Sequence, residues 1–158
     1  DRPDDARAHH QALSRLTQDP DIEAMYVWNR YSLIHGVRVA ERTLAAELAW
    51  GKGDIDRASA ILQEAIAIED DLPYDEPPAW HAPVRQTLGA LLLEAGRADE
   101  AEAVYRAELK RNPENGWSLF GLEQALRAKN KRDEADHVAE RFQRAWAHSD
   151  ITLSSSRL

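Results

Sequence analysis

The sequence has no cysteine among its 158 residues, which excludes disulfide bonds and zinc sites built from thiolates. It also has no long apolar run, and a membrane-spanning helix needs about 18 or more apolar residues in succession. Basic residues are in the minority, with 20 Lys and Arg against 28 Asp and Glu and a net charge of −8. Nucleic-acid binders gain affinity by neutralising phosphates, so this charge argues against such a partner. We expect a cytoplasmic protein that binds neither membranes nor nucleic acids.

A helical pattern is what the sequence does contain. Apolar residues make up 43% and charged residues 30%, which suits one helix-rich globular domain. From Val84 to Leu109 the apolar residues recur at helical spacing, in two stripes separated by Gly96. Gly96 predicts the end of the first helix, and Pro113 predicts the end of the second. Gly89 and Ala101 are small enough to let these two helices approach closely.

This stretch resembles the tetratricopeptide repeat, a helix-turn-helix unit of 34 residues. The residues that carry the resemblance are Leu88, Gly89, Leu92, Ala101, Tyr105 and Pro113. An ordinary helical hairpin has no reason to combine all six. The turn at 96–101 recurs 34 residues later at 130–135 and 43 residues earlier at 53–58. The chain is therefore expected to hold about three such repeats.

We predict a single all-α domain, a right-handed superhelical array of antiparallel helix pairs. Its expected parts are N-terminal packing helices at 1–36, repeat one at 37–70, a proline-rich acidic insertion at 71–83, repeat two at 84–115, repeat three at 116–147 and a C-terminal tail at 148–158. The packing helices run from Asp4 to Thr17 and from Pro20 to Leu33. His35 and Gly36 are expected to separate them from the first helix of repeat one, whose apolar stripe is Val37, Ala40, Leu44 and Leu48.

The insertion has two interpretations. In the first it is a structural clasp, in which Tyr74 and Trp80 cover the seam between repeats and Arg85 pairs with Asp75 or Glu76. In the second it is a metal or catalytic site formed by Asp75, Glu76 and His81, whose side chains are able to hold a cation. No further histidine follows at helical spacing, so we favour the clasp and predict no metal, no cofactor and no catalytic residues.

The run Tyr74-Asp75-Glu76-Pro77-Pro78, followed by Trp80, also resembles a stretch found in the C-terminal repeats of bacterial tetratricopeptide proteins. The resemblance supplies no activity for this run. The chain lacks an initiator methionine and a signal peptide. We expect it to be the C-terminal part of a longer bacterial array.

In this family, the first helices of successive repeats line an inner groove that takes an extended peptide or a helix. Carried onto this chain, the resemblance implies a partner-binding groove of Thr43, Glu47 and Trp50 in repeat one, Gln86, Leu93 and Glu94 in repeat two, and Trp117, Phe120, Gln124 and Arg127 in repeat three. Family members that clamp acidic C-termini use Lys and Asn at positions that hold Glu47, Gln86 and aromatics here. We therefore predict a non-enzymatic interaction scaffold whose protein or peptide ligand is partly aromatic and partly polar. The alternative for Trp117 and Phe120 is packing on Tyr105 or the preceding loop.

The last apolar stripe of repeat three ends at Trp146 and needs a cover, since a terminal repeat otherwise leaves apolar side chains in water. Ile151 and Leu153 are candidates for a short lid that folds back over it. Without such a lid, the exposed face belongs to another protein or to a second copy. Self-association through the C-terminal end, giving a homodimer, is the alternative role.

Overall fold

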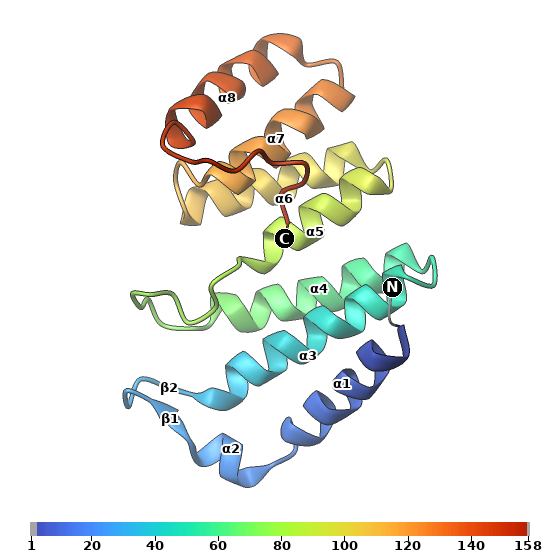
Figure 1. Ribbon diagram of the computed structural model, residues 1–158, viewed down its shortest axis with the longest axis vertical. Helices are drawn as coiled ribbons and strands as arrows, with labels where there is room; N and C mark the ends of the chain where they lie inside the picture. Colours follow the sequence, from blue (N-terminus) through green and yellow to red (C-terminus); the bar gives the residue numbers. More distant parts are fainter. Residues whose placement is uncertain (1–2, 158) are drawn as a thin grey trace. The chain divides into compact units, whose positions relative to one another are not determined.

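The computed structural model describes residues 3–157 as two compact units, one ending at Val84 and the other beginning at Arg85 (Figure 1). Both units consist mainly of α-helices, and sequential helices pair with one another. The predicted all-α fold of helix pairs is therefore confirmed. Residues 1, 2 and 158, at the outer ends of the predicted N-terminal part and C-terminal tail, lie outside the described residues. No helix within 3–157 is long and apolar enough to cross a membrane.

Three long helices form the first unit: α1 (Pro3–Leu16), α3 (Leu33–Trp50) and α4 (Ile55–Asp70). The central one is α3, because it packs against both α1 and α4. Ser32 caps α3 by accepting a hydrogen bond from the Ile34 N–H at 3.3 Å, and Asp54 caps α4 through the Arg57 N–H at 3.2 Å. The core of this unit includes small and branched side chains at Val39, Ala46, Ala58, Leu62 and Ala65.

The stretch from Pro20 to Leu33 is not the continuous helix that its apolar content predicts. It forms three short elements, α2 (Pro20–Ala24) and two antiparallel strands, β1 (Tyr26–Val27) and β2 (Tyr31–Ser32). The turn between the strands places Trp28 and Asn29 at φ values of 48° and 57°, which no right-handed helix accommodates. Trp28 is 67% exposed, whereas α2 packs against α3.

The start of α3 also differs from the prediction. His35 and Gly36 lie inside the helix, because the Ser32 cap starts it at Leu33. A Cβ on Gly36 would have nothing within 4 Å, so this glycine lowers helix propensity without ending the helix. The residues predicted for the buried stripe are only half-buried: Val37, Ala40, Leu44 and Leu48. The most buried apolar residues of α3 are Ile34, Val39, Ala46 and Ala49, since this helix contacts neighbours on two sides.

The second unit contains two helix pairs that cover the residues predicted as repeats two and three. Their helices are α5 (Val84–Glu94), α6 (Ala98–Arg111), α7 (Gly116–Ala128) and α8 (Arg132–Ala145). Gly96 has a φ of 74° and follows α5 within two residues, as the helix-stop prediction requires. The predicted leucines form the core: Leu88, Leu91 and Leu92 on α5, and Leu119, Leu122 and Leu126 on α7.

Tyr105 on α6 fixes the packing of its neighbours. Its fully buried ring lies against two glycines, Gly89 on α5 and Gly121 on α7. A Cβ on either glycine would overlap the ring, so both helices approach α6 more closely than any larger residue would allow. The close approach predicted for Gly89 is confirmed, and Ala101 is fully buried as that prediction requires.

Glu102 on α6 joins this helix to the α7–α8 turn. Its carboxylate accepts hydrogen bonds from Lys129 at 2.6 Å, Lys131 at 3.0 Å and Arg106 at 2.9 Å. These three cations hold the pKa of the Glu102 carboxyl down to about 2 from its ordinary 4.5, with Lys129 as the largest cause. The second unit is thus held by an ionic contact as well as by its apolar core.

Candidate functional site

A small buried site lies where α5, α6 and α7 meet. It is formed by the hydroxyl of Tyr105, the backbone carbonyl of Gln86, and the two glycines against which the Tyr105 ring packs, Gly89 and Gly121. We refer to these four residues as the Tyr105 site. Burial raises the pKa of the Tyr105 hydroxyl well above its ordinary value, so this group stays a neutral hydrogen-bond donor.

The Tyr105 site is occupied by a segment from the end of the chain. After α8, residues 148–157 form no helix and run back to α5, and we call them the return segment (Figure 1). Its Ser156 is 2% exposed and donates a hydrogen bond to the Gln86 carbonyl at 3.1 Å. The Tyr105 hydroxyl lies 2.5 Å from the Ser156 Oγ. Because the single Ser156 proton goes to Gln86, Tyr105 is the donor in this second bond.

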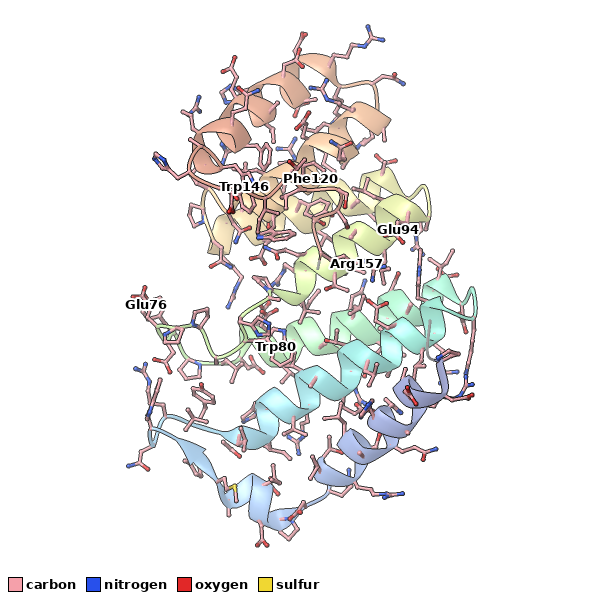
Figure 2. The ribbon with its side chains drawn as sticks, viewed as in Figure 1. Glu76, Trp80, Glu94, Phe120, Trp146 and Arg157 are labelled. Carbon is pink, nitrogen blue, oxygen red and sulfur yellow. The ribbon has the colours of Figure 1, made fainter. Side chains whose placement is uncertain are left out.

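Two further contacts hold the return segment on either side of Ser156. Arg157 lies 3.5 Å from the carboxylate of Glu94 on α5, and Figure 2 shows the two side chains next to one another. Nearer to α8, the indole N–H of Trp146 donates to the Ile151 carbonyl at 2.7 Å. The predicted fold-back is therefore observed, although Ile151 is itself 57% exposed and Leu153 half-buried. The residue that the fold-back buries most deeply is Ser156.

An aromatic cluster lies between α7 and α8. Trp117 meets Trp146 edge-on at a centroid distance of 5.7 Å, and Phe120 lies 5.7 Å from Phe142. Phe142 also stacks on Trp146, and the ring of Trp146 lies against Gly116. Trp117 and Phe120 are both half-buried, so their faces toward α8 are occupied. The apolar stripe that ends at Trp146 is therefore covered in part by residues of the same chain.

The other groove residues predicted on the second unit have different surroundings. Gln86 is buried, and its side-chain amide donates to Asn115 at 2.9 Å and to Ser118 at 3.3 Å. Leu93 is half-buried, whereas Gln124 and Arg127 are exposed. Arg127 is engaged in ion pairs with Glu123 at 2.8 Å and Asp136 at 3.0 Å.

The three groove residues predicted on the first unit all lie on α3. Thr43, Glu47 and Trp50 are half-buried. The Thr43 hydroxyl donates to the Val39 carbonyl at 2.8 Å, which is a bond within the helix. A concave region elsewhere on this unit, of about 470 Å³, shares none of these three residues and is lined partly by basic side chains: Arg7, His10, Lys52 and Arg57.

The insertion makes a contact that the sequence did not indicate. Asp75 lies 3.6 Å from the guanidinium of Arg30, which also donates to the Tyr74 carbonyl at 2.6 Å. Arg30 belongs to the β1–β2 turn, so the insertion is held to that turn. Tyr74 is 77% exposed and hydrogen-bonds Glu76 in its own loop, which corrects its predicted role as a cover.

The alternative for the insertion was a metal site. Asp75 is half-buried, Glu76 and His81 are exposed, and the His81 ring lies 5.7 Å from that of Trp80. Among residues 3–157, no group of three or more His, Cys, Asp or Glu side chains gathers in a way that would hold a metal ion.

Sequence reasoning did not identify Tyr105, Ser156 or Arg157 as site residues. The resemblance names Tyr105 as a packing position, and nothing in that role indicates a second bond through its hydroxyl. Ser156 stands 51 residues after Tyr105 in a run of three serines, a composition typical of irregular structure. Only the three-dimensional structure brings them together.

Comparisons with known proteins agree with the fold. No protein-family model matches the sequence. Among solved structures, the chain is similar to one described as the crystal structure of MamA protein, with a TM-score of 0.56 and 16% sequence identity. The similarity covers 76% of this chain and 68% of that chain. At this identity it shows the fold alone, and together with the helix pairs it supports a tetratricopeptide-like repeat fold.

Proposed function

We propose that the chain is a non-enzymatic interaction scaffold that binds a non-helical peptide of a partner protein along the first helices of its repeats. The observation that supports this proposal is the return segment, a piece of irregular polypeptide held on α5 by a buried serine and an ion pair. A surface that holds one such segment has the chemistry to hold another. The groups at this surface are a hydroxyl, a carboxylate and aromatic rings, which serve recognition.

The proposed binding surface keeps the residues inferred from the family resemblance. On the second unit they are Gln86, Leu93, Glu94, Trp117, Phe120, Gln124 and Arg127, to which the Tyr105 hydroxyl is added. On the first unit they are Thr43, Glu47 and Trp50. Trp and Arg are the residue types found most often among binding hot spots, so Trp50, Trp117 and Arg127 are the strongest candidates for affinity.

The proposal is tested by affinity capture with the full chain, using partners identified by mass spectrometry and then purified. Glu94→Arg reverses the charge beside the Tyr105 site and is expected to weaken binding of the purified partner by about twofold to fivefold. The matched control is Glu140→Arg, the same change at an exposed position on α8. Equal affinity of both variants and wild type for every captured partner would contradict the proposal.

Self-association through the C-terminal end is the alternative proposal. It rests on the position of Trp146 at the end of the last helix pair, where a second copy of the chain has access to Phe142 and Ile151. The contacts of Trp146 with Trp117 and with the Ile151 carbonyl occupy part of this surface. We therefore place binding of a different protein first.

A further inference from the structure

The return segment fits the Tyr105 site as a ligand fits its binding site. Ser156 is the only residue of 148–157 that is fully buried, and its side chain reaches the Gln86 carbonyl on α5 and the Tyr105 hydroxyl on α6. Its hydroxyl satisfies two groups at once, accepting from Tyr105 and donating to Gln86. Without Ser156, the buried Tyr105 hydroxyl would lose this hydrogen-bond acceptor. Leaving a buried donor unpaired costs free energy.

The burial around the Tyr105 hydroxyl limits what is able to occupy the site. The side chain that reaches this hydroxyl, Ser156, is itself only 2% exposed. A longer side chain would meet the surrounding protein, so an occupant must reach the hydroxyl with a short one. Alanine is short but offers no acceptor, and a carboxylate would lose its hydration on burial. Serine satisfies both conditions.

The residue after the serine meets a charge of the opposite sign. Arg157 follows Ser156 and lies against Glu94, which stands two helical turns after Gln86 on α5. Glu94 is partly exposed, so its ion pair with Arg157 orients the bound segment more than it strengthens binding. The pair fixes which way a peptide runs across α5.

We infer that the Tyr105 site is a recognition site for a peptide with a serine followed by arginine or lysine, and that the return segment is its internal occupant, which a partner must displace. The inference rests on the proposed function and specifies the partner's chemistry and the regulation of the site. The return segment is tethered to α8, so it competes at an effective concentration of about 1 mM or more. Binding of a partner is therefore weaker in the intact chain than the site itself permits.

The test uses full-length variants and a fluorescein-labelled synthetic peptide of residues 148–157 as the probe, with binding followed by fluorescence anisotropy. Ser156→Glu in the protein cannot enter the Tyr105 site and should release the return segment. The matched control is Ser154→Glu, the same change at an exposed serine of the same segment. We expect the probe to bind Ser156→Glu at least about tenfold more tightly than wild type or Ser154→Glu, because the internal competitor is gone.

The chemistry of recognition is tested in the Ser156→Glu protein. A probe carrying Ser156→Ala should bind about tenfold more weakly, since the Tyr105 hydroxyl loses its acceptor. Adding Glu94→Arg to the protein should weaken the original probe by about twofold to fivefold, and a probe with Arg157→Glu should recover that loss. Recovery by the opposite charge would not be seen if Glu94 acted only on folding.

Release of the segment is measured separately by hydrogen exchange at residues 150–157. We expect protection of these amides in wild type and Ser154→Glu and fast exchange in Ser156→Glu. Protection that persists in Ser156→Glu would overturn the inference, because the named contacts would not hold the segment. Equal affinity of the probe for all three proteins would also overturn it, since the segment would then be part of the fold and not a ligand. Partner capture that still responds to Glu94→Arg but not to Glu140→Arg would leave the proposed function standing in either case.

Discussion

Tyr105 occupies space that two glycines leave open, and this arrangement makes a prediction about side-chain volume. Gly121→Ala adds a Cβ that overlaps atoms of the Tyr105 side chain. We therefore expect the free energy of unfolding to fall by about 1 to 3 kcal/mol through overpacking. Gly89→Ala should act in the same direction. Urea denaturation followed by circular dichroism measures both changes.

The control for this prediction is Gly36→Ala in the first turn of α3. Nothing lies within 4 Å of a Cβ at that position, so the change should stabilise the protein by about 0.5 to 1 kcal/mol through helix propensity. If Gly121→Ala also stabilised the protein, the close packing against Tyr105 would be contradicted.

Glu102 gives the second unit a stability that depends on pH. Its pKa is lowered in the folded state, so its contribution is present above the unfolded pKa of 4.5 and is lost as pH falls towards about 2. Each unit of pKa shift corresponds to about 1.4 kcal/mol. We expect Glu102→Gln to be clearly less stable than wild type at pH 6, and the difference to shrink as pH falls from 4.5 to 2. Denaturant titrations at a series of pH values test this, and a difference that is constant with pH would contradict it.

At the scale of elements, the β1–β2 turn holds the insertion through Arg30. Arg30→Met removes the ion pair with Asp75, whose side chain is only 7% exposed, and the bond to the Tyr74 carbonyl. We expect limited proteolysis to cut within 71–83 faster in this variant, and the free energy of unfolding to fall by about 1 to 3 kcal/mol because the buried Asp75 carboxylate loses its cation. Arg15→Met, at an exposed position on α1, is the control and should be cut at the wild-type rate. Equal rates in both variants would show that Arg30 does not hold the insertion.

Some of these elements are predictable from the sequence, and others are not. The helices of the second unit follow from their apolar spacing and from Gly96, because these are local signals that act over three or four residues. The β1–β2 hairpin was missed since its turn uses Trp28 and Asn29 at positive φ in place of glycine. The return segment and the Arg30–Asp75 pair depend on residues that are 45 or more positions apart in the chain, and a single sequence carries no signal for such contacts.

For the whole molecule, the alternative role of self-association is decided by its mass in solution. We expect a monomer in sedimentation equilibrium, because Trp146 is engaged by Trp117 and by the return segment. A dimer that forms with rising concentration and dissociates in Trp146→Asp would contradict this expectation and favour self-association. Trp50→Asp, a matched change on α3, controls for a general loss of folding in that experiment.

The enclosure of Tyr105 has a consequence for motion within the second unit. The end of its ring lies between the backbones of α5 and α7, so the ring is unable to turn about its own axis unless those helices move apart. The two sides of the ring should therefore give separate NMR signals, which exchange only as often as the helices open. The rate of that exchange would report how often α5 and α7 move apart, without any label or substitution.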